Sequence, residues 1–139
     1  MKKICICASF KFYDNVLKLA DTLKSNGVEA MIPIPNQFLN LTNRTDRDFN
    51  NGADKPREEK IIAAYWKHIT DHLTRIESAD IVYIYTEDGY IGNGVSLEIG
   101  YAHSLKKNTY SSEEINDLPI SCFIQKIIHP DGLIKIAQS

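Results

Sequence analysis

Glu98 has the surroundings expected of a catalytic carboxylate. Residues 79–85 are mostly apolar, which predicts a buried strand, and Gly92-Asn93-Gly94 then opens a helix that carries Glu98 among small and apolar neighbours. Glycine lets the backbone approach a ligand closely, and the positive end of a helix favours an ionised carboxylate. Such a carboxylate at the carboxyl end of a strand can act as a nucleophile. The alternative is an exposed glutamate on an ordinary amphipathic helix.

Three blocks around Glu98 form a recognisable pattern. They are Ala-Asp-Ile-Val at 79–82, Asp-Gly-Tyr-Ile-Gly-Asn-Gly at 88–94 and Leu-Glu-Ile-Gly-Tyr-Ala at 97–102, followed by two lysines. This pattern resembles the nucleoside 2-deoxyribosyltransferase-like superfamily, which includes the deoxynucleotide N-glycosidases, and the match covers roughly residues 60–112. The resemblance implies cleavage or transfer at the N-glycosidic bond of a (deoxy)nucleoside or nucleotide, with Glu98 as the nucleophile.

Two positions depart from the pattern of that family. Its members have an Asp in the glycine-rich loop that assists the departing base; Gly92 occupies that position here, so Asp88 or Asn93 is the candidate for the role. A second family Asp, which orients the sugar, is replaced by His72. A histidine can hydrogen-bond a sugar hydroxyl or act as an acid near neutral pH. The alternative is a histidine that flanks an apolar stripe and has no catalytic part.

The segment Ala-Ser-Phe-Lys-Phe-Tyr at 8–13 carries groups that suit a nucleoside. Ser9, Lys11 and the amides that begin the next helix can hold a phosphate or a sugar hydroxyl, and Phe10 or Tyr13 can stack on a base. An aromatic plug that closes the end of the sheet is the alternative for Phe10 and Phe12. In the resembling family this loop lines the substrate pocket. The expected substrate-binding residues are Ser9, Phe10, Tyr13, Tyr90, Asn93 and Gly94.

The histidines and cysteines do not form a recognisable metal motif. His68 and His72 have a spacing on one helix that can bind zinc, but no third ligand is evident, so we expect no metal site. Cys5 and Cys7 lie on one face of a strand with Cα atoms about 6.5–7 Å apart, which is poor geometry for a disulfide. We expect them to be small buried hydrophobic side chains in a reducing cytoplasm. The chain lacks Gly-x-Gly-x-x-Gly and Walker sequences, and we expect no cofactor.

Bulk composition bounds the size, the partners and the location of the protein. The 139 residues predict a single domain spanning 1–139. A net charge of −2, with scattered basic residues, argues against a nucleic-acid polymer as partner. No apolar run approaches the length of a membrane span, and the first four residues lead into a strand instead of a signal peptide. We therefore expect a cytoplasmic protein that binds a small nucleoside or nucleotide and no membrane.

The order of expected elements predicts the fold class. Strands are expected at 4–8, 28–32, 79–85, from Thr109-Tyr110 and within 120–128. Helices are expected from Asp14 to Asn26-Gly27, from Pro56 to Ile76, from Val95 to Lys106 and from Asp131 to Ile136. This alternation predicts an α/β fold with an open, doubly wound, Rossmann-like parallel sheet of four to five strands in the order 2-1-3-4-5.

The segment 36–56 is polar and has the period of neither a helix nor a strand. It follows the second strand and so leaves the sheet at its carboxyl edge. We expect a flap that closes over the pocket, with Arg44 or Arg47 available to meet a phosphate or carboxylate. A surface insertion without contact to substrate is the alternative.

Large apolar side chains on the expected helix 56–76 predict self-association. The helix carries Tyr65, Trp66, Ile69 and Leu73, more apolar bulk than one sheet face needs. We expect a homodimer or a higher homo-oligomer, and members of the resembling family complete their pocket with a neighbouring subunit.

The sequence leaves the reaction open at several points. It does not distinguish a hydrolase from a transferase, nor does it select the base, the sugar or a 5′-phosphate. A non-catalytic nucleotide-binding or sensing domain on the same scaffold is the competing interpretation, in which Glu98 only hydrogen-bonds a ribose.

Overall fold

The two most deeply buried strands, β1 (Ile4–Cys7) and β3 (Ile81–Ile84), pair in parallel over their whole length, and each of their residues is at most 1% exposed. The computed structural model describes residues 1–34 and 59–139. Its sheet has five parallel strands in the order β2-β1-β3-β4-β5. The remaining strands are β2 (Ala30–Met31), β4 (Asn108–Ser111) and β5 (Lys126–Ile127). The predicted fold class and strand order are confirmed.

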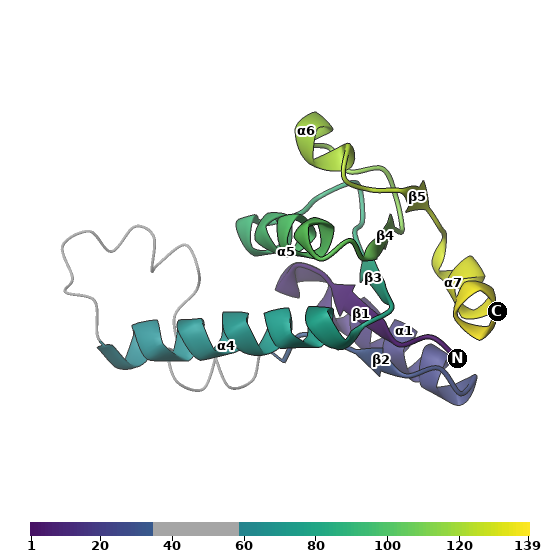
Figure 1. Ribbon diagram of the computed structural model, residues 1–139, viewed down its shortest axis with the longest axis horizontal. Helices are drawn as coiled ribbons and strands as arrows, with labels where there is room; N and C mark the ends of the chain where they lie inside the picture. Colours follow the sequence, from purple (N-terminus) through teal and green to yellow (C-terminus); the bar gives the residue numbers. More distant parts are fainter. Residues whose placement is uncertain (35–58) are drawn as a thin grey trace.

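Helices cover both faces of this sheet, as Figure 1 shows. Cys5 and Cys7 point to the face covered by α4 and α5, whereas Ile4 and Ile6 point to the face covered by α1 and α7. This division follows from the two-residue period of a strand. The helical elements are η1 (Phe10–Phe12), α1 (Tyr13–Ser25), α4 (Glu59–Ser78), α5 (Asn93–Ser104), α6 (Leu118–Ser121) and α7 (Pro130–Gln138).

Several element ends differ from the sequence prediction. Asp14 lies in the first turn of α1 instead of capping it, because the 3-10 turn η1 runs directly into the helix. His129, and not Asp131, is the N-cap of α7, since a proline takes the first helical position. Within 120–128 the strand is only two residues long, because α6 occupies the start of that range. The strand expected at 28–32 is also shortened to two residues.

The predicted flap at 36–56, with Arg44 and Arg47, lies outside the described residues. In the part of the chain that the structure describes, no helix combines the length and the apolar character needed to cross a membrane.

The loop after β3 is tied to the loop after β4. Thr86 and Ser112 exchange two hydrogen bonds of 2.9 Å: the Thr86 amide donates to Ser112 Oγ, which donates to the Thr86 carbonyl. Further along, the Asn116 amide donates to the Gly89 carbonyl at 3.0 Å, and Asn116 Nδ2 donates to the Asp88 carbonyl at 2.7 Å. Asp88 and Gly89 both have positive φ, at 56° and 76°. The turn at Asp88 and Gly89 is therefore held by the backbone and the side chain of Asn116, in the loop after β4.

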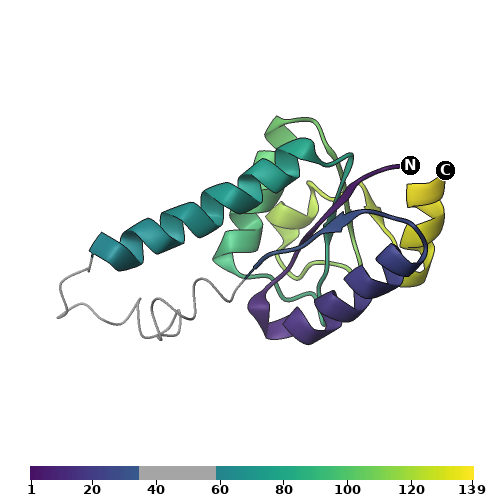
Figure 2. The ribbon, with the colours of Figure 1, turned by 90° about the horizontal axis from the view of Figure 1, so that it is seen from below.

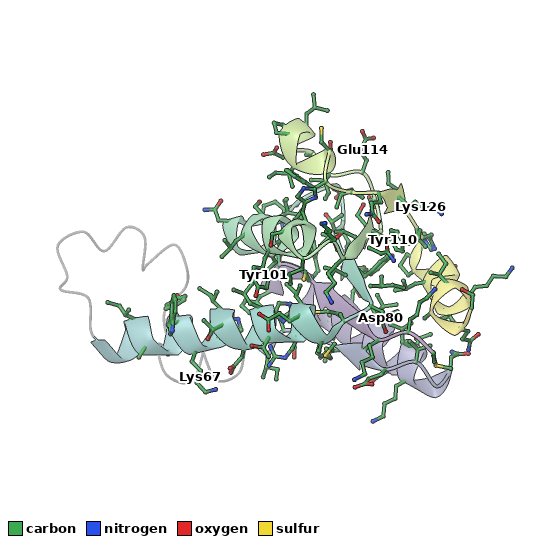
Figure 3. The ribbon with its side chains drawn as sticks, viewed as in Figure 1. Lys67, Asp80, Tyr101, Tyr110, Glu114 and Lys126 are labelled. Atoms are coloured by element: carbon green, nitrogen blue, oxygen red, sulfur yellow. The ribbon has the colours of Figure 1, made fainter. Side chains whose placement is uncertain are left out.

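α4 and α5 lie side by side on their shared sheet face (Figures 1 and 3). Tyr101 points from α5 toward α4, where its hydroxyl donates to the carboxylate of Glu77. Lys107 Nζ donates to the Glu77 carbonyl at 2.8 Å. These bonds fix the two helices together near one end, so that residues one to two turns earlier in each helix also face each other. The amino-terminal half of α4 extends past the sheet (Figure 2).

We expect Gly89→Ala to destabilise the protein. A Cβ at this position would lie 2.5 Å from Asn116 Oδ1 and 2.6 Å from the Glu114 carbonyl oxygen, and φ is +76°. Positive φ and this overlap should lower the free energy of unfolding by about 1–3 kcal/mol, measured by urea denaturation.

Gly100→Ala is the matched control. A Cβ at Gly100 meets no atom within 4 Å, and alanine favours a helix interior over glycine by about 0.5–1 kcal/mol. This substitution should therefore stabilise the protein slightly. An unchanged denaturation midpoint for Gly89→Ala would contradict the turn described above.

Candidate active site

Glu98 lies in the second turn of α5 and directs its carboxylate toward α4. Gly92 is the N-cap of the helix and offers no capping side chain. The Glu98 side chain is 14% exposed. Burial raises the pKa of Glu98 to about 7, although the neighbouring His72 acts in the opposite direction. The carboxyl group is therefore shared between its ionised and neutral forms near neutral pH.

His72 is the residue that meets Glu98. Its Nε2 lies 3.8 Å from Glu98 Oε2, 3.7 Å from Cys5 Sγ and 3.4 Å from Cys7 Sγ, and its Nδ1 lies 3.3 Å from Arg75 Nη1. The residue is 3% exposed. Burial lowers the pKa of His72, but the hydrogen bond with Cys5 and the charge of Glu98 outweigh it, so the pKa is raised overall.

Cys5 and Cys7 are fully buried beside His72, and the pKa values of their thiols are shifted in opposite directions. The hydrogen bond from Cys7, helped by His72, lowers the pKa of Cys5 to about 6. The same hydrogen bond, together with burial, raises the pKa of Cys7 well above its usual value. Between the two thiols, the surroundings therefore favour the ionised form at Cys5 over Cys7. Among the described residues, Cys5, Cys7 and His72 are a group with ligating atoms close enough to hold a metal ion, within 4.8 Å of one another.

Aromatic side chains gather at the carboxyl end of β1. Phe10 and Tyr90 are 38% and 45% exposed, whereas Phe12 is buried. The Phe10 ring centroid lies 6.3 Å from that of Tyr13 and 5.4 Å from that of His68. The Phe12 ring lies 6.1 Å from Tyr90. The partly exposed rings provide flat apolar surfaces on which a base can stack.

In the same region, the ammonium group of Lys11 lies over an aromatic ring. Lys11 Nζ lies 4.7 Å from the centroid of the Tyr90 ring. Ser9 Oγ accepts from the Lys11 amide at 3.2 Å and so caps η1. His68 is half-buried, and this burial lowers its pKa.

The other predicted site residues lie on the loop after β3 and at the start of α5. Asp88 is exposed on the turn that Asn116 holds, and its amide donates to Glu113 Oε1 at 3.2 Å. Asn93 and Gly94 form the exposed first turn of α5. The roles given to these residues, and to Ser9, Phe10, Tyr13 and Tyr90, stay predictions.

The structure brings together two of the predicted catalytic residues, Glu98 and His72, and adds two cysteines that sequence reasoning assigned to the apolar core. The Cys5 and Cys7 contacts with His72 span 67 and 65 positions in the chain, so local periodicity did not reveal them. Two observations taken together could have revealed the contact. Both cysteines lie on one face of their strand, and His72 follows the spacing of the apolar face of α4.

Two cavities lie away from this cluster. One, of about 340 Å³, is lined by residues of β4, α6 and β5, and the other, of about 230 Å³, lies between α1 and α7. Neither is lined by Glu98 or His72. The chemistry of Glu98 therefore places the candidate site, and cavity size does not.

Solved structures share this fold. The 2-deoxyribosyltransferase from Bacillus psychrosaccharolyticus matches with a TM-score of 0.63 and 19% identity, over 95% of this chain and 90% of that chain. A conserved protein from Enterococcus faecalis V583 matches with a TM-score of 0.60 and 13% identity, over 99% of this chain and 98% of that chain. No family model and no curated protein matches the sequence. The chain has the fold of a 2-deoxyribosyltransferase, in agreement with the resemblance of its sequence.

Proposed function

We propose that the protein cleaves or transfers at the N-glycosidic bond of a (deoxy)nucleoside or nucleotide, with Glu98 as the nucleophile. The observation that carries the proposal is a mostly buried carboxylate, 3.8 Å from an imidazole, in the second turn of the helix that follows the central strand. Ligands of open α/β sheets bind at this edge. The shared fold with a 2-deoxyribosyltransferase supports the substrate class.

The proposed mechanism has two steps. In the first, a Glu98 oxygen forms a bond to the anomeric carbon while the bond from that carbon to the base breaks, and the base leaves with the electron pair. The transition state resembles an oxocarbenium ion, which a carboxylate beneath the sugar stabilises. In the second step, water or another base attacks the same carbon and releases Glu98.

His72 acts in this mechanism as a positioning residue. Both of its ring nitrogens already face protein groups, and the side chain is buried. A protonated imidazole beside Glu98 favours the ionised carboxylate that must attack. The departing base needs a proton or a hydrogen bond: Asn93, in the first turn of α5, is the proposed hydrogen-bond donor, and Asp88, on the preceding loop, is the proposed acid in its protonated form.

The partly exposed rings of Phe10, Tyr13 and Tyr90 are the proposed base-stacking surface, with Ser9 and Gly94 beside the sugar. The three cysteines form no disulfide, which fits the reducing cytoplasm where nucleotides are metabolised. We therefore propose a cytoplasmic location.

We expect Glu98→Gln to abolish base release. The amide is isosteric but lacks the charge that attacks the sugar, so turnover should fall at least about 10³-fold. Purified protein is incubated with deoxynucleosides, ribonucleosides and their 5′-monophosphates, and free base is separated by chromatography. Glu29→Gln is the matched control, since Glu29 is exposed and lies beside the opposite, amino end of the sheet.

The melting temperature of Glu98→Gln should stay close to that of the wild type, so that lost activity is not lost fold. A mass increase on the peptide containing Glu98, after rapid quenching with substrate, would support the covalent intermediate. Full activity of Glu98→Gln would exclude it. Tight nucleotide binding by the wild type without any base release would favour the sensing domain instead.

We further propose that two chains associate through the amino-terminal half of α4. This half extends past the sheet (Figure 2) and exposes 42% of Ile62, 70% of Trp66 and 36% of Ile69. Exposed apolar side chains gathered on one element commonly mark an interface.

Trp66→Glu should convert the assembly to a monomer, because the new charge would be buried without a partner. The molar mass is read by light scattering during size-exclusion chromatography at micromolar concentration. Lys67→Ala, on the next residue, is the control and should leave the mass unchanged. A wild-type protein that is already monomeric would contradict the proposal.

A further inference from the structure

Cys5, Cys7 and His72 form a buried cluster, and the proposed reaction gives the two thiols no role. Its three ligating atoms lie within 4.8 Å of one another, and all three residues are buried. Glu98 Oε2 stands at 3.8 Å from His72 Nε2. We infer that these four side chains form a binding site for a soft divalent cation such as Zn²⁺, with Cys5 Sγ, Cys7 Sγ and His72 Nε2 as ligands and Glu98 in the fourth position.

The distances suit tetrahedral coordination. Zinc lies about 2.3 Å from a thiolate sulfur and about 2.0–2.1 Å from an imidazole nitrogen, which at the tetrahedral angle separates sulfur from nitrogen by about 3.5–3.6 Å. The two sulfur-to-nitrogen distances here are 3.7 Å and 3.4 Å. A carboxylate oxygen would stand about 3.4 Å from the nitrogen, so Glu98 has to move by a few tenths of an ångström from its 3.8 Å position.

The donor set selects the metal class. Two thiolates and an imidazole favour Zn²⁺ and related borderline-soft ions, whereas Mg²⁺ and Ca²⁺ prefer oxygen ligands. The thiols are fully buried, so the ion enters past Glu98, the most exposed member at 14% of its side chain. Binding displaces the thiol protons and any proton on His72 Nε2 into solvent, and His72 keeps its proton on Nδ1.

Arg75 opposes this site in its present position. Its Nη1 lies 3.3 Å from His72 Nδ1, yet a metal-bound imidazole needs an acceptor there. The guanidinium must therefore turn away when the ion binds. A residue with a carbonyl oxygen at position 75 should strengthen binding by accepting from Nδ1.

The site would also control the chemistry of Glu98. A carboxylate bound to the ion cannot attack a sugar, so Zn²⁺ should inhibit base release. This consequence rests on the proposed function, whereas metal binding itself does not.

The test titrates Co²⁺ into the full chain after reduction and removal of metal by a chelator. Binding of one Co²⁺ per chain should produce a thiolate-to-cobalt charge-transfer band in the near ultraviolet and visible bands of tetrahedral cobalt. Zn²⁺ should then displace the Co²⁺ and remove both signals. A chromophoric competing chelator gives the Zn²⁺ affinity.

Variants assign the ligands. Cys5→Ser and Cys7→Ser should each weaken Zn²⁺ binding by more than the roughly 10–100-fold that loss of an outer-shell partner costs. Cys122→Ser is the matched control, because Cys122 is exposed outside the cluster, and it should bind normally. Arg75→Gln, at a half-buried position of α4, should bind several-fold more tightly than the wild type.

The result that would overturn the site is a Co²⁺ complex without a charge-transfer band, or unchanged Zn²⁺ affinity in both serine variants. If these variants fail to fold, unchanged or weakened binding by Arg75→Gln has the same meaning. Glu98→Gln separates the two proposals: it should lose base release and keep the charge-transfer band, since both thiolates remain.

Discussion

A carboxylate buried in an apolar layer needs a partner, and in this fold the partner of Glu98 is His72, whose Nε2 stands 3.8 Å away. The imidazole comes from a different helix, α4, and the thiols of Cys5 and Cys7 lie beside it. This weaker pairing leaves the pKa of Glu98 near 7, whereas a full salt bridge would lower it. When it is ionised, a carboxylate of raised pKa is a better base and nucleophile, which is the property that the proposed reaction requires of Glu98.

The pairing depends on how α4 and α5 dock. Both helices pack on the same sheet face, and Tyr101 and Lys107 join them through Glu77. The cysteines of β1 form the floor beneath the pair. Three elements that are separated in the chain, β1, α4 and α5, are therefore needed to surround the Glu98 carboxylate.

The features of the fold that follow from local sequence patterns could be predicted. Strand–helix alternation predicted the sheet order, which is confirmed. The glycine-rich turn singled out Glu98 as a nucleophile, a role that stays a prediction. The cap of α7 was mistaken because a proline at the first helical position moves the boundary by two residues, to His129. The partners of Cys5 and Cys7 were missed for a deeper reason: a strand pattern tells which face a residue occupies, but not which residue of the covering helix lies above it. That register is set by packing along α4.

The parallel pairing of β1 with β3 also has a kinetic consequence. The first residues of the chain bond to residues far along it: the Lys3 amide donates to Asp80 across 77 positions, and the two strands match from Ile4 and Ile81 onward. Such distant contacts bring no reward until a long loop has closed, and they are formed slowly. Cys5 and Cys7 lie on β1, so they take their places beside His72 and Glu98 only when β1 pairs with β3. The Glu98 carboxylate therefore meets His72 and the two cysteines together only after the amino-terminal strand has joined the sheet.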